Sequence, residues 1–144
     1  MAAPTVAPWR LNLLRAYYAL LGFGSLAVFW PDLVRHSAGE GIESGAQFAL
    51  LSALAPLALL GLRYPLRLLP LLLFEFLWKM LWFVFVMAPL FAAGRMTALV
   101  WSNAFACSIA IVLTPIVVPW DYLWRNYVTA PAERWRNSPA ATPN

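Results

Sequence analysis

The stretch LLPLLLFEFLWKMLWFVFVMAPLF, residues 68–91, carries only two charged side chains, Glu75 and Lys79. About 20 predominantly apolar residues in a helix span the hydrocarbon core of a bilayer, which is about 30 Å thick. The stretch is therefore long enough to be a transmembrane helix. Prolines near its two ends are compatible with this, since neighbouring helices can satisfy the backbone groups that they free. The stretch predicts an integral membrane protein.

The composition of the whole chain agrees with this prediction. Of 144 residues, 62% are hydrophobic and 11% are charged, and the mean hydropathy is +0.70. A soluble domain has about 25% charged residues, so a soluble fold of this composition would lack the polar side chains to cover its surface. The chain is also too short for a second domain of ordinary size.

Three other segments are apolar enough to cross a membrane. Together with the first stretch, the predicted spans are residues 11–30, 45–62, 68–91 and 98–119. We therefore predict an all-α four-transmembrane-helix bundle that occupies residues 1–128. Arg10 and Arg15, followed by an apolar run, would also suit a secretory signal, but the bulky Phe29 and Trp30 stand where small residues would mark cleavage, which favours a retained helix.

The arginines predict the orientation of the bundle. Seven of them flank one set of span ends: Arg10, Arg15, Arg63, Arg67, Arg125, Arg134 and Arg136. The opposite ends have only Arg35 and Arg95. The positive-inside rule then places both termini in the cytoplasm. Nine arginines against one lysine are typical of GC-rich bacterial coding, so we expect the inner (cytoplasmic) membrane of a bacterium.

The segment WDYLWRNYV, residues 120–128, predicts a short amphipathic helix at the cytoplasmic interface. Its apolar side chains have helical spacing: Trp120, Leu123, Trp124, Tyr127 and Val128. Asp121 and Arg125 are four apart and are expected to pair on the polar side. We expect Trp120, Trp124, Tyr127 and Arg125 to be the interfacial anchors. A simple continuation of the fourth span is the alternative, but the two prolines before this segment favour a separate helix.

Two polar segments are expected outside the membrane. Residues 31–44, PDLVRHSAGEGIES, predict an external acidic connector, with a binding role as the alternative. Residues 129–144, TAPAERWRNSPAATPN, predict a disordered cytoplasmic tail because they are poor in apolar side chains and rich in Pro, Ala and Asn.

The chain has few residues with reactive or metal-binding chemistry. Cys107 is the only cysteine, which excludes an internal disulfide or a C-x-x-C pair. His36 is the only histidine, which excludes bis-histidine haem ligation within one chain. We expect no catalytic residue, no metal and no cofactor. Basic residues lie at span ends rather than in a patch, so membrane lipid is the expected partner and nucleic acid is not.

Glu75 and Lys79 are expected to lie deep in the membrane. If Arg67 marks the cytoplasmic interface, Glu75 is about 12 Å and Lys79 about 18 Å into the bilayer at 1.5 Å per residue. One such charge costs roughly 2.5–3.5 kcal/mol at a helix centre. Residues at i and i+4 share a helix face, and glutamate before lysine is the favourable order, so the two side chains can neutralise each other. Such a pair is expected to face other helices or a wet cavity.

Other side chains could complete a buried polar cluster with Glu75 and Lys79. Trp78 and Trp82 share their helix face, and an indole N–H can donate to the carboxylate while its ring covers the ammonium. Asn103 and Ser102 of the fourth span are possible partners, as are Tyr17 and Tyr18 of the first. The sequence leaves open whether Glu75 pairs with Lys79 or with another helix.

The run LGLRYPLRLLPLLLFEFLWK, residues 60–79, resembles a segment of short four-helix bacterial inner-membrane proteins of uncharacterised function. The Arg-Tyr-Pro turn, the Leu-Pro-rich helix start and the Phe-Glu-x-Leu-Trp-Lys run carry this resemblance. The chain is similar to the DoxX-like class only in size and hydropathy. The resemblance implies a four-helix plan but no activity, and no functional residue is carried over from it.

The sequence leaves four functions open. The first is a non-enzymatic accessory, assembly or structural subunit, with Glu75–Lys79 fixing helix register or docking onto a membrane-protein partner. The second is a homo-oligomeric small transporter or proton-coupled exporter using Glu75, although a lysine neighbour opposes the protonation that exchange requires. The third is a membrane enzyme acting on lipid or quinone, with Glu75 as base. Pigment or haem binding between subunits is a further alternative.

Overall fold

The computed structural model describes residues 6–35 and 41–131, and within these ranges the chain forms helices and no strand. Four helical segments are long and apolar enough to cross a membrane: Pro8–Arg35, Ile42–Arg63, Leu69–Ala92 and Ala98–Val117. The first two are α1 and α2, and the last is α5. The predicted all-α, four-span plan of a membrane protein is thereby confirmed.

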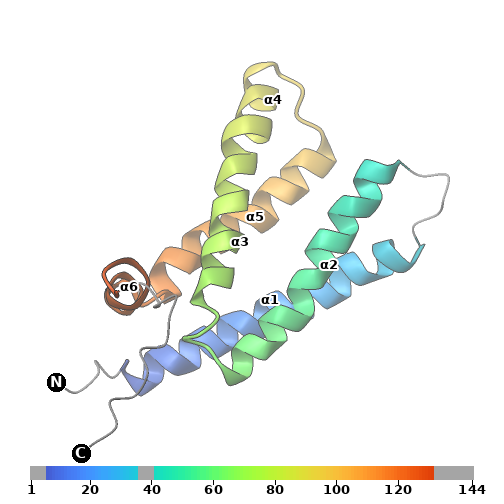
Figure 1. Cartoon of the computed structure of the whole chain (residues 1–144). Helices are drawn as coiled ribbons and strands as arrows, with labels where there is room; N and C mark the ends of the chain where they lie inside the picture. The colour runs from blue at the N-terminus through green and yellow to red at the C-terminus, as the bar shows by residue number, and fades with distance from the viewer. Residues whose placement is uncertain (1–5, 36–40, 132–144) are drawn as a thin grey trace, which may run out of the picture.

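The four spans form two helical hairpins (Figure 1). In the first hairpin α1 packs along α2, and in the second α3 (Leu69–Trp82) packs against α5. The hairpins meet where α1 contacts α5. They converge at the end that holds the turn between α2 and α3 and separate toward the opposite end (Figure 1). We call these the closed end and the open end of the bundle.

The first helix is longer than the predicted span of residues 11–30. It starts at Pro8 and continues through Pro31 to Arg35. A proline inside a helix removes one backbone hydrogen bond. Beside Pro31, the Trp30 indole donates to the carbonyl of Ser52 at 3.1 Å and joins this end of α1 to α2. Residues 31–35 of the predicted external connector are therefore helical. His36 and Glu40 of that connector lie outside the described residues.

The third span is three helical pieces rather than one regular α-helix. A π-helical turn, η1 (Phe83–Met87), follows α3 and precedes α4 (Ala88–Ala92). Pro89 cannot donate a backbone hydrogen bond, and π turns commonly re-satisfy carbonyls near a proline in membrane helices. Accordingly, the N–H of Ala88 bonds to the carbonyl of Phe83, five residues back. The π turn begins directly after α3, the helix that carries Glu75 and Lys79.

The buried core lies at the closed end. Its apolar members are Leu14, Tyr17, Tyr18, Ala58, Leu69, Leu72, Val117, Val118 and Leu123. Tyr18 is fully buried against Gly61, where an added Cβ would lie 2.4 Å from Cδ1 of the ring. Its hydroxyl donates to the carbonyl of Pro65 at 3.1 Å. Glycine at this position thus lets α1 and α2 approach closely, as small residues do between membrane helices.

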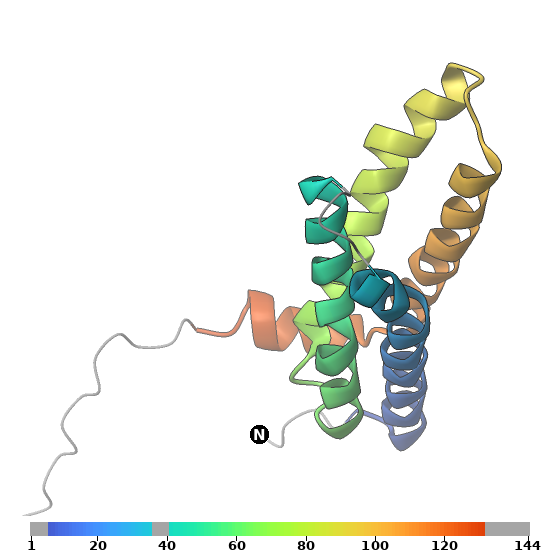
Figure 2. The same cartoon turned by 90° about the vertical axis from the view of Figure 1, so that its right-hand side faces the viewer.

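Residues 120–128 form a separate helical segment, as the two prolines suggest. It consists of α6 (Trp120–Leu123) and a π-helical turn, η2 (Trp124–Val128), and it runs across the bundle rather than along α5 (Figure 2). The hydroxyl of Tyr127 donates to the carbonyls of Leu66 at 3.0 Å and Arg67 at 3.2 Å. These two contacts of the Tyr127 hydroxyl hold the segment against the turn between α2 and α3.

The predicted ion pair between Asp121 and Arg125 is wrong. No salt bridge joins their charged groups within residues 6–35 and 41–131, where Lys79–Glu75 is the ion pair formed. The π turn that begins at Trp124 adds residues per turn, so side chains four apart no longer lie above one another. Of the predicted disordered tail, residues 132–144 lie outside the described residues.

Candidate functional site

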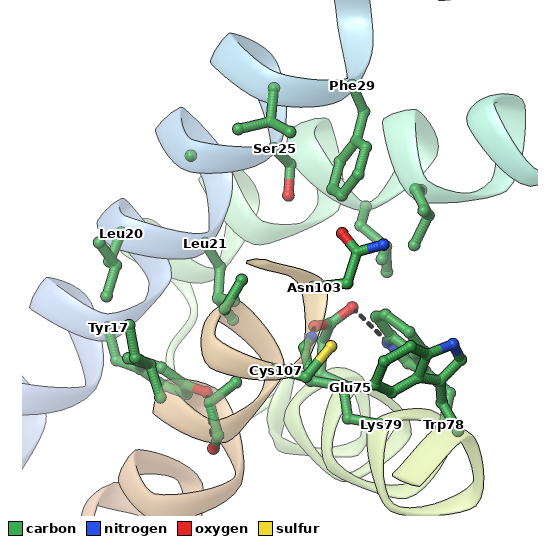
Figure 3. Close-up of a pocket in the computed structure, with 18 of the residues that line it drawn as sticks. Tyr17, Leu20, Leu21, Ser25, Phe29, Glu75, Trp78, Lys79, Asn103 and Cys107 are labelled. Carbon is green, nitrogen blue, oxygen red and sulfur yellow. Dashed lines mark hydrogen bonds and ion pairs between the residues drawn. The ribbon is translucent and has the colours of Figure 1, made fainter. Parts of the chain in front are cut away.

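Glu75, Lys79 and Trp78 form a compact polar group on α3 (Figure 3). The Lys79 ammonium forms an ion pair with Oε2 of Glu75. The Trp78 indole N–H donates to Oε1 of Glu75 at 3.0 Å, and the ammonium lies 4.3 Å from the centre of the Trp78 ring. Glu75 and Lys79 keep only 4% and 8% of their surface exposed. Each carboxylate oxygen thus has a donor from the same helix.

The local sequence explains this geometry. Pro70 stands in the first turn of α3, where its missing N–H costs no helical bond. From there the helix is regular to Trp82, which brings side chains three and four apart onto one face. Glu75 and Lys79 are therefore neighbours by helical spacing alone, and Trp78 lies beside both. No side chain from another helix donates to the Glu75 carboxylate in the described part of the chain.

A pocket of about 360 Å³ opens beside this group, in the wedge between the two hairpins. All four spans contribute one face to it. The lining residues of α1 and α2 are Tyr17, Leu20, Leu21, Gly24, Ser25, Val28, Phe29, Gln47, Leu51 and Leu54. Those of α3 and α5 are Glu75, Trp78, Lys79, Trp82, Asn103, Ala106, Cys107, Ile109 and Ala110. Most of these side chains are apolar, so the polar group faces a largely hydrophobic space.

The predicted cluster members occupy different places around the pocket. Trp82 lines it next to Lys79 without bonding to the carboxylate, and its ring packs edge-on against Phe83, with centroids 5.6 Å apart. Asn103 also lines the pocket and is exposed, with its amide directed into the space above Glu75 (Figure 3). Asn103 is therefore near the pair but is not its hydrogen-bond partner.

The two tyrosines that the sequence offered as partners act elsewhere. Tyr17 lines the pocket, but its hydroxyl bonds to Oγ1 of Thr114 at 2.7 Å and joins α1 to α5 rather than reaching Glu75. Tyr18 bonds to Pro65 at the closed end and does not line the pocket. Ser102 does not line it either.

Several lining residues were missed from the sequence. Ser25, Gln47 and Cys107 add polar atoms to the walls. The lining positions of α1 follow helical spacing from Tyr17 to Phe29, and Gly24 leaves open space at their centre, because an added Cβ there would meet no atom within 4 Å. That spacing was visible in the sequence. The spacing does not predict a pocket, because the sequence does not show which helix lies opposite this face of α1.

The predicted interfacial anchors lie together near the closed end. Trp120 donates its indole N–H to the carbonyl of Pro115 at 2.8 Å, and Trp124 is 60% exposed. Tyr127 is bonded to the turn between α2 and α3. Arg125 lines a shallow hollow of about 280 Å³ together with Arg10 at the start of α1.

The fold and the pocket define a multi-pass helical membrane protein with a buried ion pair facing an intramembrane pocket. A scan against protein-family models finds no match, and neither do searches of curated proteins and of solved structures. The resemblance of residues 60–79 to uncharacterised four-helix proteins therefore stays a prediction.

Proposed function

We propose that this chain is a small non-catalytic protein of the inner membrane, an accessory or assembly subunit in which Glu75 and Lys79 form a structural ion pair. The strongest support is that both oxygens of the Glu75 carboxylate have a donor on the same helix. Lys79 bonds to one oxygen of the carboxylate, and the Trp78 indole bonds to the other. The carboxylate thus has its partners before any substrate arrives, which suits a structural role better than a reacting one.

The energetics of the pair agree with a structural role. Two separate charges at the centre of a helix would together cost on the order of 5–7 kcal/mol in the membrane. A bonded pair is neutral overall, and the Trp78 ring further stabilises the ammonium. Removing one partner of a buried pair leaves an uncompensated charge, at a cost of about 3–5 kcal/mol, whereas replacing both partners is often nearly neutral.

A homo-oligomeric transporter or proton-coupled exporter is the second candidate, and one observation favours it: the pocket reaches Glu75. An exchanging carboxylate must take up and release a proton during each cycle. Protonation of Glu75 would remove the ion pair with Lys79, which weighs against this function. A membrane enzyme acting on lipid or quinone with Glu75 as base meets the same obstacle.

Substitution of the pair tests these alternatives. The variants are Glu75→Gln, Lys79→Met and the double variant, and the measurement is the free energy of unfolding in a denaturing-detergent titration. A structural pair predicts that each single variant is less stable and that the double variant largely recovers. Wild-type stability in both single variants would contradict the structural role.

A matched pair of tryptophan variants controls for loss of an indole. Trp78→Phe and Trp82→Phe both keep an aromatic ring, but only Trp78 donates to Glu75. We expect Trp78→Phe to lose about 1 kcal/mol of stability and Trp82→Phe to lose less. The transport alternative makes a different prediction: Glu75→Gln would fold normally and lose proton-coupled flux in liposomes, and the double variant would not recover it.

We further propose that the closed end faces the cytoplasm, with residues 120–128 at the lipid interface. The support is the gathering of arginines there: Arg63 and Arg67 both lie against the ring of Tyr64, at 5.6 and 5.7 Å. Arg15 donates to the carbonyl of Leu62 at 3.3 Å. Anionic headgroups attract such a cluster on the cytoplasmic side.

Cysteine labelling of intact cells tests this orientation. In a Cys107→Ser background, a membrane-impermeant maleimide should label Ala93→Cys, at the open end, and should not label Thr129→Cys until the cells are broken. Labelling of Thr129→Cys in intact cells would show the opposite orientation.

A further inference from the structure

The pocket between the hairpins has chemistry that goes beyond a structural ion pair. We propose that it is a binding site for an uncharged, lipid-soluble molecule with a ring-containing hydrocarbon body and a carbonyl or hydroxyl oxygen that accepts a hydrogen bond from Lys79. This site would exist alongside the structural role of the pair and does not depend on it.

The polar end of the pocket has unused hydrogen-bonding capacity. A lysine ammonium has three N–H donors. In the described part of the chain, one donates to Glu75 and the Trp78 ring covers the ammonium on one side. Donor capacity therefore remains on the Lys79 ammonium, which lines the pocket. An oxygen acceptor placed there would find a charge-assisted donor in a nearly dry environment, where such bonds are strong.

The charge of the site selects for a neutral ligand. Glu75 and Lys79 are bonded to each other, so the group that faces the pocket has no net charge. A cationic ligand would meet the Lys79 ammonium, and an anionic one would meet the Glu75 carboxylate. Either ion would also lose its hydration without a free counter-charge to replace it. A carbonyl or hydroxyl group avoids this cost.

The walls and the size of the pocket suit a ring-containing body. Phe29 on one side and Trp78 and Trp82 on the other supply aromatic surfaces, with leucine and valine side chains between them. The volume of about 360 Å³ falls within the usual range of small-molecule pockets. Asn103 and Ser25 add polar atoms that point into the same space (Figure 3).

The pocket is open to the surface that lipid would cover. Leu20, Val28 and Ile109 line it and are 55%, 58% and 43% exposed. A molecule dissolved in the bilayer can therefore enter from the side, between the separated ends of the hairpins (Figure 1). A charged or strongly hydrated molecule would have to cross hydrocarbon to reach the same entrance.

A larger side chain at Gly24 would fill the pocket without a steric clash. It lies on the lining face of α1, and an added Cβ would meet no atom within 4 Å. Gly24→Leu should thus occupy the binding space without disturbing the packing of the free protein. Ala106→Leu fills the pocket from the second hairpin. The matched control is Ala27→Leu, which adds the same side chain to an exposed position of α1 outside the lining.

The test uses tritium-labelled 4-hexylacetophenone as the neutral carbonyl probe. Binding is measured on the full-length protein in phosphatidylcholine nanodiscs, and binding to empty nanodiscs is subtracted. Unlabelled competitors with the same body but different heads are 1-ethyl-4-hexylbenzene, 4-hexylbenzoate and 4-hexylbenzylammonium. Circular dichroism and gel filtration establish that each variant is folded before its binding is compared.

We expect saturable binding of the ketone and competition by the hydrocarbon analogue that is about three- to tenfold weaker, since only the hydrogen bond is lost. Gly24→Leu and Ala106→Leu should each lower the affinity at least about tenfold, while Ala27→Leu leaves it unchanged. The proposal is overturned if the ketone shows no saturable binding, if both pocket-filling variants bind it like the wild type, if the hydrocarbon competes equally, or if either ion competes better.

Discussion

The hydroxyl of Tyr17 lies 2.7 Å from Oγ1 of Thr114, and this contact joins α1 to α5. The carbonyl of Ala110 lies 2.7 Å from the Thr114 hydroxyl and 3.4 Å from the Tyr17 hydroxyl, and either hydroxyl can be the donor in the bond between them. Both side chains are buried. Because the two hairpins meet at α1 and α5, this chain of two hydrogen bonds connects them at the floor of the pocket.

Tyr17→Phe should weaken the joint between the hairpins. The substitution removes one buried hydrogen bond but leaves Thr114 bonded to Ala110, so we expect a loss of about 1 kcal/mol in the free energy of unfolding. A denaturing-detergent titration measures it. Tyr64→Phe is the control, since the Tyr64 hydroxyl has no hydrogen-bond partner within the described residues. Equal effects of the two substitutions would show that the Tyr17 bond contributes nothing.

Gly61→Ala should destabilise the first hairpin. The new Cβ would lie 2.4 Å from Cδ1 of Tyr18, a fully buried ring whose hydroxyl is bonded to Pro65. The ring cannot move aside freely, so a loss of about 1–3 kcal/mol is expected from overpacking. Gly24→Ala adds the same methyl group in open space and should be neutral or stabilising by up to about 1 kcal/mol. A thermal-unfolding comparison in which both variants gain stability would contradict the close approach.

Ser52→Ala should stabilise the protein slightly. Oγ of Ser52 is buried and has no hydrogen-bond partner within the described residues, and an unpaired buried hydroxyl is unfavourable. The Trp30 indole bonds to the backbone carbonyl of Ser52, which the substitution keeps. We expect a gain of up to about 1 kcal/mol. Ser102→Ala, at an exposed position of α5, is the control that measures the general effect of alanine on helix stability. A gain no larger than that of Ser102→Ala would contradict the prediction.

Docking of residues 120–128 should weaken at high pH. Burial, with a smaller contribution from Tyr122, raises the pKa of Tyr127 above its ordinary value of 10.0. The docked segment therefore holds the phenol proton at a pH where the undocked segment has lost it. By linkage, the stabilisation is complete below pH 10 and is lost as the pH rises through the raised pKa.

A nitroxide on Val128→Cys in a Cys107→Ser background can report this transition. Its electron paramagnetic resonance spectrum should show restricted motion below pH 10 and faster motion above it, whereas Tyr127→Phe should show faster motion at every pH. A spectrum independent of both pH and the Tyr127 hydroxyl would show that the hydrogen bonds to Leu66 and Arg67 do not dock the segment.

The number and the class of the helices could be predicted from residue order because each depends on local composition. An apolar run of about 20 residues must form a helix in a bilayer, since no water is present to satisfy its backbone groups. The pairing of Glu75 with Lys79 was foreseeable for a similar reason, because helical spacing alone makes them neighbours. The two prolines before residues 120–128 likewise predicted a helical segment separate from the fourth span.

Two predictions from the local sequence were wrong, one at Pro31 and one at Asp121 and Arg125. The sequence predicts that the first span ends at Trp30, but α1 continues through Pro31 to Arg35, and the Trp30 indole is bonded to α2. The pairing of Asp121 with Arg125 assumed α-helical spacing, and the π turn at Trp124 changes that spacing. In both places the outcome depends on the energy of the wider structure rather than on the residue type.

The sequence alone thus determined that this chain has four helices long and apolar enough to span a membrane, and that Glu75 and Lys79 share one face of the third span. Only the tertiary structure decided that the hairpins separate, that Tyr17 meets Thr114, and that faces from four helices enclose one pocket beside Glu75 and Lys79. The physical reason is the range of the interactions. Hydropathy and helical spacing act between neighbours in the chain, whereas the angle between the hairpins depends on packing among residues far apart in sequence.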